Sequence, residues 1–180
     1  SIGSDIYIDF SGIEEKAGYG TNKYAASVRA YETTTSRLLG TETGYSQARK
    51  GELMLCVEEA MNDAVDKVLA RITSYWNADL SLGVQYKLVL NMASDFDEEQ
   101  IEEIQFVLID VIENMTNKSK ENILTSQTMD YNIWCDPREY NKSSKVYRNL
   151  KESFKNEDIE GTISKININR KMILLKVDYE

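Results

Sequence analysis

Histidine is absent from this 180-residue sequence, and only one proline and two cysteines are present. Without an imidazole the chain cannot build a Ser-His-Asp or a Cys-His catalytic centre. No serine has a lysine three residues later, so the S-x-x-K pattern of Ser-Lys enzymes is missing as well. The glycines at positions 18, 20, 40 and 44 lack the Gly-Lys-Ser/Thr end of a phosphate-binding loop. We therefore predict no catalytic residue and no cofactor.

The two cysteines, Cys56 and Cys135, are too few for a disulfide framework, and their spacing matches no zinc motif. We predict that both are buried free thiols, with a single disulfide between them as the alternative. No stretch approaches the ~20 consecutive apolar residues that cross a bilayer, and no signal peptide is recognisable. The chain begins at Ser1 without a methionine, which we interpret as a mature or trimmed form.

The net charge of -9 opposes non-specific binding to nucleic acid or to an anionic membrane, because both require an excess of basic side chains. The charge is unevenly distributed. Residues 1–137 contain 11 basic and 23 acidic side chains, whereas residues 138–180 contain 10 basic and 7 acidic ones. The carboxyl-terminal quarter is therefore the one segment expected to face an anion.

Hydrophobic periodicity predicts a sheet followed by a long helix in the first half of the chain. Alternating apolar residues predict strands at 5–10, 23–32 and 37–43, with a glycine-rich connection between the first two. From residue 51 to residue 76 the spacing becomes that of an amphipathic helix roughly 39 Å long. Its expected buried face consists of Leu53, Val57, Met61, Ala64, Val68, Ile72 and Tyr75.

A second unit is predicted to follow a linker at residues 77–83. Its strands are expected at 84–92, 128–135, 161–168 and 172–179. Two helices separate these strands, the first capped by Ser94 or Asp95 and the second by Ser143 or Ser144.

The predicted fold class is α+β, with each unit formed by a sheet that carries helices on one face. The expected order of elements is βββα in residues 1–80, which include one long amphipathic helix, and βαβαββ in residues 81–180.

Acidic residues gather at the start of the first helix of the second unit, at Asp95, Asp97, Glu98, Glu99, Glu102 and Glu103. Calcium binds such carboxylates, but the segment lacks the glycine and the distal glutamate of an EF-hand loop. Acidic side chains in the first turn are also favoured by the helix dipole. We therefore favour a solvated helix start and predict no metal site.

Five basic residues recur every three or four positions in the last predicted helix: Lys142, Lys145, Arg148, Lys151 and Lys155. This spacing places them on one face of that helix. A solvated basic face is the simpler interpretation, and a surface for an anion or an acidic partner is the alternative.

Four aromatic residues leave a similar choice open. Tyr75 and Trp76 in the first unit, with Tyr131 and Trp134 in the second, could form an aromatic contact patch. Packing in the core is the favoured interpretation.

The stretch from Tyr24 to Gly44, YAASVRAYETTTSRLLGTETG, resembles a known pattern of strand, turn, strand and long helix. It is similar to an α/β domain of bacterial envelope proteins, namely the curli-secretion lipoprotein, the lipoprotein activator of penicillin-binding proteins and the middle domain of a flagellar assembly protein. It also resembles uncharacterised secreted proteins of Bacteroidetes. The resemblance covers roughly residues 5–76, and those families normally have further strands before the equivalent of Asp5. No functional residue carries over from them.

The resemblance implies a non-catalytic periplasmic, outer-membrane-associated or secreted protein that acts as an assembly or scaffolding component through protein contacts. Envelope proteins are the expected partners, a homo-oligomer is one form of such an assembly, and nucleic acid is not expected to bind. A glycan-binding domain or a carboxylate-dependent cell-wall hydrolase is the alternative, because paired carboxylates cannot be recognised from sequence. A pore subunit of the curli-secretion type is the third possibility. It would require membrane-spanning hairpins of about 10 alternating residues per strand, and the sequence contains no recognisable segment of this kind.

Overall fold

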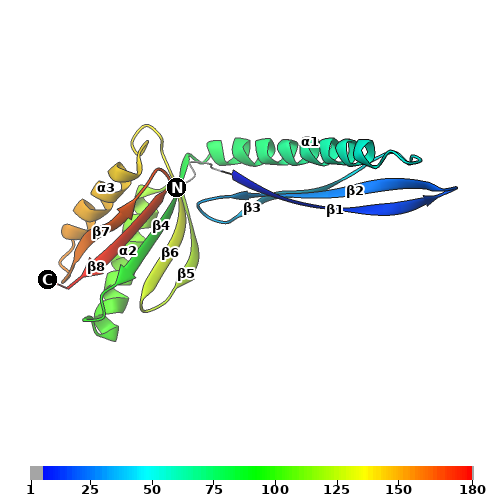
Figure 1. The fold of residues 1–180 in the computed structure, drawn as a ribbon. Helices are drawn as coiled ribbons and strands as arrows, with labels where there is room; N and C mark the ends of the chain where they lie inside the picture. The colour runs from blue at the N-terminus through cyan, green and yellow to red at the C-terminus, as the bar shows by residue number, and fades with distance from the viewer. Residues whose placement is uncertain (1–5, 180) are drawn as a thin grey trace. The chain divides into compact units, whose positions relative to one another are not determined.

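The computed structural model describes residues 6–179, which form eight strands and three helices (Figure 1). The chain divides into two compact units between Ala78 and Asp79. Unit 1 contains β1 (Ile6–Gly18), β2 (Thr21–Glu32), β3 (Leu38–Tyr45) and most of α1 (Leu53–Leu80). Unit 2 contains β4 (Val84–Met92), α2 (Glu98–Met115), β5 (Lys118–Leu124), β6 (Thr128–Cys135), α3 (Ser143–Lys155), β7 (Thr162–Ile168) and β8 (Met172–Asp178). The predicted α+β class is confirmed.

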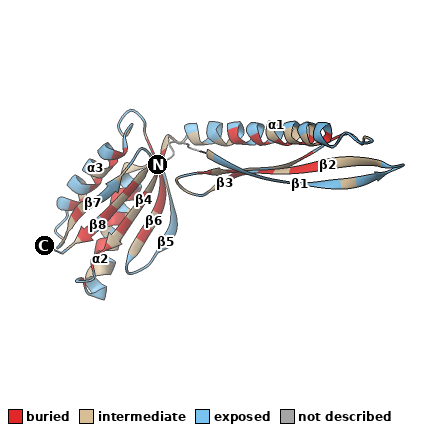
Figure 2. Cartoon of the chain, in the orientation of Figure 1, coloured by how far each residue is buried: buried red, intermediate tan, exposed pale blue. Residues whose placement is uncertain are grey.

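Unit 1 is an antiparallel sheet of order β1-β2-β3 with α1 packed on one face. Ala26, Val28 and Ala30 of β2 point toward α1 and are fully buried, as their alternation predicted. Figure 2 shows buried residues along β2 and α1, whereas most of β1 is exposed. The core of this unit is therefore narrow, and it is centred on the middle strand.

The buried line of α1 differs from the prediction. It consists of Cys56, Ala60, Ala64, Val68 and Ile72, whereas Leu53 is exposed and Val57, Met61 and Tyr75 are partly buried. Small residues explain the shift, because Gly44 of β3 lies directly against the backbone of Ala60 and Ala64. The larger apolar side chains consequently flank the closest point of approach.

Gly44→Ala tests this close packing. A methyl group at Gly44 would overlap the Ala60 carbonyl oxygen and the Ala64 amide nitrogen, and backbone atoms cannot turn aside as a side chain can. Overpacking of this kind typically costs about 1–3 kcal/mol, and we expect unit 1 to lose stability in that range. Denaturant unfolding measures the loss.

Thr41→Ala is the matched control, because Thr41 is exposed on the same strand. Its effect should remain within about 0.5 kcal/mol. Equal midpoints for the two variants would contradict the tight contact between β3 and α1.

The first two strands are longer than expected, and their connection is shorter. Residues 11–18 were predicted to form a turn-rich connection, which is wrong: they continue β1 and pair with β2. The turn itself is limited to Gly18, Tyr19 and Gly20, all of which have positive φ. Likewise, α1 continues through residues assigned to a linker and ends at Leu80.

Unit 2 is a mixed sheet of order β5-β6-β4-β8-β7, in which β4 and β8 are parallel and all other neighbours are antiparallel. Both helices cover one face. Ile104 and Leu108 of α2, and Leu150 and Phe154 of α3, join alternate residues of the strands in one core. Along the sheet, α2 packs near β5 and β6, whereas α3 packs near β7 and β8.

The structure adds one strand that the sequence did not predict. β5, KSKENIL, pairs antiparallel with β6 at the edge of the sheet. Because it is charged, mostly exposed and interrupted by a register shift between Glu121 and Ile123, it lacks the alternation of a half-buried strand. The observed order in unit 2 is therefore βαββαββ.

Each unit carries one buried free thiol, which agrees with the favoured prediction for the cysteines. Cys56 lies on the buried side of α1, and Cys135 ends β6 in the core of unit 2. Burial raises the pKa of the Cys135 thiol to about 12, so the reactive thiolate is scarce at neutral pH.

We expect neither thiol to react with dithionitrobenzoate at about pH 8 in the native chain, and both to react once denaturant opens the units. Cys135→Ala leaves Cys56 as a reporter of unit 1, and Cys56→Ala leaves Cys135 as a reporter of unit 2. Rapid labelling of Cys135 under native conditions would show that the core of unit 2 is open to reagent.

Candidate functional site

A groove of about 720 Å³ runs between α3 and the edge strand β7. The lining side chains of α3 include Tyr147, Arg148, Lys151, Glu152 and Lys155, and those of β7 include Lys165, Ile166 and Ile168. Figure 1 shows the two elements side by side at one margin of unit 2. The groove thus combines a short apolar surface with a cluster of basic side chains.

The amphipathic character of α3 orients these side chains. Val146, Leu150 and Phe154 are buried against the sheet, which directs Lys151 and Lys155 toward solvent. On β7, Ile166 lies at a register shift between Lys165 and Asn167, and half of its surface (51%) is exposed. A β-bulge at a sheet edge commonly re-aims side chains in this way.

The groove is strongly cationic. Arg148, Lys151, Lys155 and Lys165 face one carboxylate, that of Glu152. None of these four cations forms an ion pair with another side chain of residues 6–179. Unneutralised like charges at a concave surface attract an anionic ligand or partner.

Only some of the basic residues predicted from the sequence line the groove. Arg148, Lys151 and Lys155 line the groove, whereas Lys142 and Lys145 do not. Lys142 is the residue that precedes α3, and its side chain makes no capping hydrogen bond. Lys165 completes the groove from β7, and spacing along one helix could not have identified it, because its position depends on the β7–β8 pairing.

The predicted cap of α3 was also wrong. Ser143 is already helical, and its hydroxyl donates to the carbonyl oxygen of Asn169 at 2.6 Å. This bond ties the start of α3 to the β7–β8 turn and so fixes the helix beside β7.

Asp97, one of the acidic residues before and in the first turns of α2, has a structural role. Asp97 caps the helix, so the prediction of Ser94 or Asp95 was wrong. The Asp97 carboxylate accepts from the Gln100 backbone N–H at 2.9 Å, and the side-chain oxygen of Gln100 accepts from the Asp97 backbone N–H at 3.0 Å. Such a capping box satisfies two amides that the helix leaves free. No group of three His, Cys, Asp or Glu side chains within residues 6–179 is arranged to hold a metal ion.

Asp97→Ala distinguishes capping from calcium binding. We expect unit 2 to lose about 1 kcal/mol of stability, as is typical for loss of an N-cap side chain, and we expect calcium to leave the melting temperature of both proteins unchanged. Differential scanning calorimetry with calcium and with chelator measures both effects. A calcium-dependent rise in melting temperature that Asp97→Ala removes would instead support a metal site.

The aromatic residues of unit 2 do not form one patch. Tyr131 points into the core, and its hydroxyl donates to Glu121 at 2.9 Å. Trp134 lies three positions further along β6, so it points to the opposite face of the sheet, where the Lys118 ammonium is 5.4 Å from the centre of its ring.

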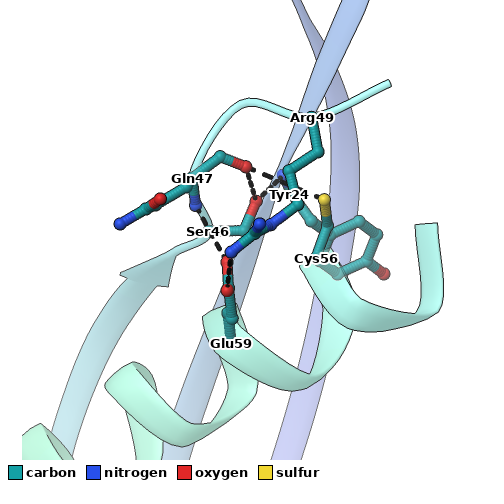
Figure 3. A network of polar contacts seen from close by, with 6 residues as sticks. All are labelled: Tyr24, Ser46, Gln47, Arg49, Cys56 and Glu59. Carbon is teal, nitrogen blue, oxygen red and sulfur yellow. Dashed lines mark hydrogen bonds and ion pairs between the residues drawn. The ribbon is translucent and has the colours of Figure 1, made fainter. Parts of the chain in front are cut away.

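A polar network in unit 1 joins the β3–α1 connection to α1 and β2 (Figure 3). The Ser46 hydroxyl accepts from the Tyr24 amide at 2.8 Å, and Glu59 accepts from the Gln47 amide at 3.2 Å and pairs with Arg49. The Arg49 side chain, with the Gln47 amide, lowers the pKa of the Glu59 carboxyl. The Ser46 hydroxyl accepts from the Tyr24 backbone amide and donates to the Gln47 carbonyl oxygen. Because no side-chain base contacts it in this network, Ser46 fastens the connection and is not activated as a nucleophile.

Unit 1 exposes apolar side chains on its edge strand. Tyr7, Ile8, Phe10 and Ile13 of β1 are each about half exposed or more. Ile8 and Phe10 pair with Ala30 and Val28, so they lie on the face that carries α1, yet α1 does not cover them. An exposed apolar edge strand is a typical site of protein association.

Comparison with protein-family models, with curated proteins and with solved structures finds no match to this chain. Within residues 6–179 no helix has both the length and the apolar composition that crossing a membrane requires. The chemistry of the α3–β7 groove is therefore the main guide to function.

Proposed function

We propose that this chain is a non-catalytic assembly component of the bacterial cell envelope, and that it binds an acidic protein surface in the α3–β7 groove. The observation that supports this proposal is the charge of the groove: Arg148, Lys151, Lys155 and Lys165 stand beside one acidic residue and have no ion-pair partner among residues 6–179. A cluster of this kind promotes association with a partner of opposite charge.

An acidic protein suits the groove better than a nucleic acid does. The chain as a whole carries a charge of -9, so a long polyanion that extended beyond the groove would be repelled by the remaining surface. Tyr147, Ile166 and Ile168 also offer apolar contact within the basic cluster. A partner that presents carboxylates around an apolar side chain would satisfy both features.

The envelope location is proposed from the resemblance of residues 5–76 to envelope assembly domains. The exposed apolar residues Tyr7, Ile8, Phe10 and Ile13 of β1 agree with a protein that works through contacts. Cell fractionation tests this location, and recovery of the chain in the cytoplasmic fraction alone would contradict it.

No observation favours the hydrolase alternative. Glu59, Asp63, Asp136 and Asp178 all have lowered pKa values, each chiefly because of a hydrogen bond from a neighbouring cation, and that of Asp136 falls to about 2 beside Arg138. A carboxyl group that donates a proton to a glycosidic oxygen needs the opposite shift.

Site-specific photo-crosslinking tests the groove in cells that produce the chain. Ile166 is replaced by benzoylphenylalanine, which places the reactive group at an exposed position among the four cations. We expect a discrete protein adduct that disappears when Arg148→Glu and Lys151→Glu are added, because reversed charges repel an acidic partner.

Tyr19, which is fully exposed at the β1–β2 turn, carries the same probe as the control. Its adducts should not respond to the two charge reversals. The proposal fails if Ile166 gives no adduct, or if its adducts are unchanged by the reversals.

A further inference from the structure

We infer that the acidic partner of the groove is a second copy of this chain, which inserts the exposed face of its α2. This inference rests on the proposed function, because it names the occupant of the same groove. It requires a surface on α2 that is complementary to the groove in charge and in apolar contact.

The exposed face of α2 is mainly acidic around one aromatic ring, and Asn114 is its exposed neutral polar residue. Phe106, which is 66% exposed, lies at its centre. Residues three, four or seven positions away share that side of the helix, and five of them are exposed acids: Glu99, Glu102, Glu103, Asp110 and Glu113. α2 contains no basic residue, and none of these five carboxylates forms an ion pair with a side chain of residues 6–179.

The two surfaces match in kind. On α2 a single large apolar side chain is flanked by carboxylates, and in the groove Tyr147, Ile166 and Ile168 are flanked by Arg148, Lys151, Lys155 and Lys165. A helix that places its central side chain in a groove while charged residues pair at the rim is a recurring mode of recognition. An uncharged partner would leave the four cations of the groove unpaired.

The topology prevents one copy from making this contact with itself. α2 packs near β5 and β6, α3 packs near β7 and β8, and β5 and β7 are the opposite edges of the sheet. The groove opens at the β7 edge, so α3 stands between it and the α2 of the same copy. The inferred contact is heterologous: each copy uses its α2 face toward one neighbour and its groove toward another. Such a contact produces an open head-to-tail chain, or a ring where the rotation between copies closes.

Sedimentation velocity of the purified full chain tests the inference over about 5 to 500 µM protein. We expect the average mass to rise beyond that of a dimer with concentration, and to fall when salt is raised from about 50 to about 500 mM, because salt screens the facing charges. A chain that remains monomeric at low salt, or that stops at a closed dimer, overturns the inference.

Two double variants provide the decisive mixture. Phe106→Ser/Asp110→Lys destroys the acidic face and keeps the groove, whereas Arg148→Glu/Lys151→Glu destroys the groove and keeps the acidic face. All four residues lie at least partly in solvent, so both variants should fold, and native shielding of Cys135 checks this. Each variant alone should be monomeric, with association weakened at least about tenfold.

An equimolar mixture should then form a one-to-one dimer and nothing larger, because one intact groove meets one intact α2 face. Asp66→Lys and Lys50→Glu, exposed charge reversals in unit 1, should associate like the original chain. Association that persists in either double variant, or a mixture that remains monomeric, overturns the inference.

The outcome separates this inference from the proposed function. If the purified chain is monomeric while Ile166 still cross-links to another protein in a manner that depends on Arg148 and Lys151, the self-association is wrong and the acidic-partner function stands. If neither signal is seen, both are wrong.

Discussion

The parallel pairing of β4 with β8 determines where every surface of unit 2 lies. Leu88 pairs with Ile173 and Leu90 with Leu175, so the last strand of the chain stands beside the first strand of the unit. Because β8 occupies that central position, β7 is displaced to the edge, and β6 and β5 extend the sheet in the other direction. The helix that precedes β7 then has to lie over the same edge, which creates the groove.

The same pairing separates charges that the average composition conceals. α2, without a basic residue, covers the half of the sheet near β5 and β6, and the basic side of α3 stands over the half near β7. Had the two helices exchanged ion pairs along their contact, both charge clusters would be neutralised internally. Because the two charge clusters are separate, one unit carries both an acidic and a basic surface. These surfaces provide the electrostatic complementarity of the inferred head-to-tail contact.

Most of the helices and strands could be predicted from the sequence. In a half-buried element the apolar residues recur every two positions in a strand and every three or four positions in a helix. Val84–Met92 and Thr128–Cys135 were predicted with their observed bounds, since each alternates against a helix-covered core. The sequence did not predict β5 or the second half of β1 as strands. Both are edge strands, which are held by hydrogen bonds to one neighbour and need no apolar face. Lys165 was missed for a related reason: its place beside α3 depends on the β7–β8 pairing, which spacing along the chain does not contain. The acidic face of α2 depends on helical spacing alone, and the sequence had already identified Glu99, Glu102 and Glu103 as part of it.

The energetics of the contact indicate a weak, concentration-dependent association. Surface ion pairs typically contribute about 0.2–1 kcal/mol each, and full burial of a Phe side chain contributes about 1.5–3 kcal/mol. Four cations and one ring therefore supply only a few kcal/mol before the loss of translational freedom is deducted, which corresponds to weak binding between free copies. At the envelope surface proposed above, neighbouring copies would face a high effective concentration, and there the same contact would suffice for a continuous array. The exposed Phe106 is consistent with such weak association. The carboxylates around it repel the same α2 face of another copy, so at low concentration the copies stay apart unless an α2 face meets a basic groove.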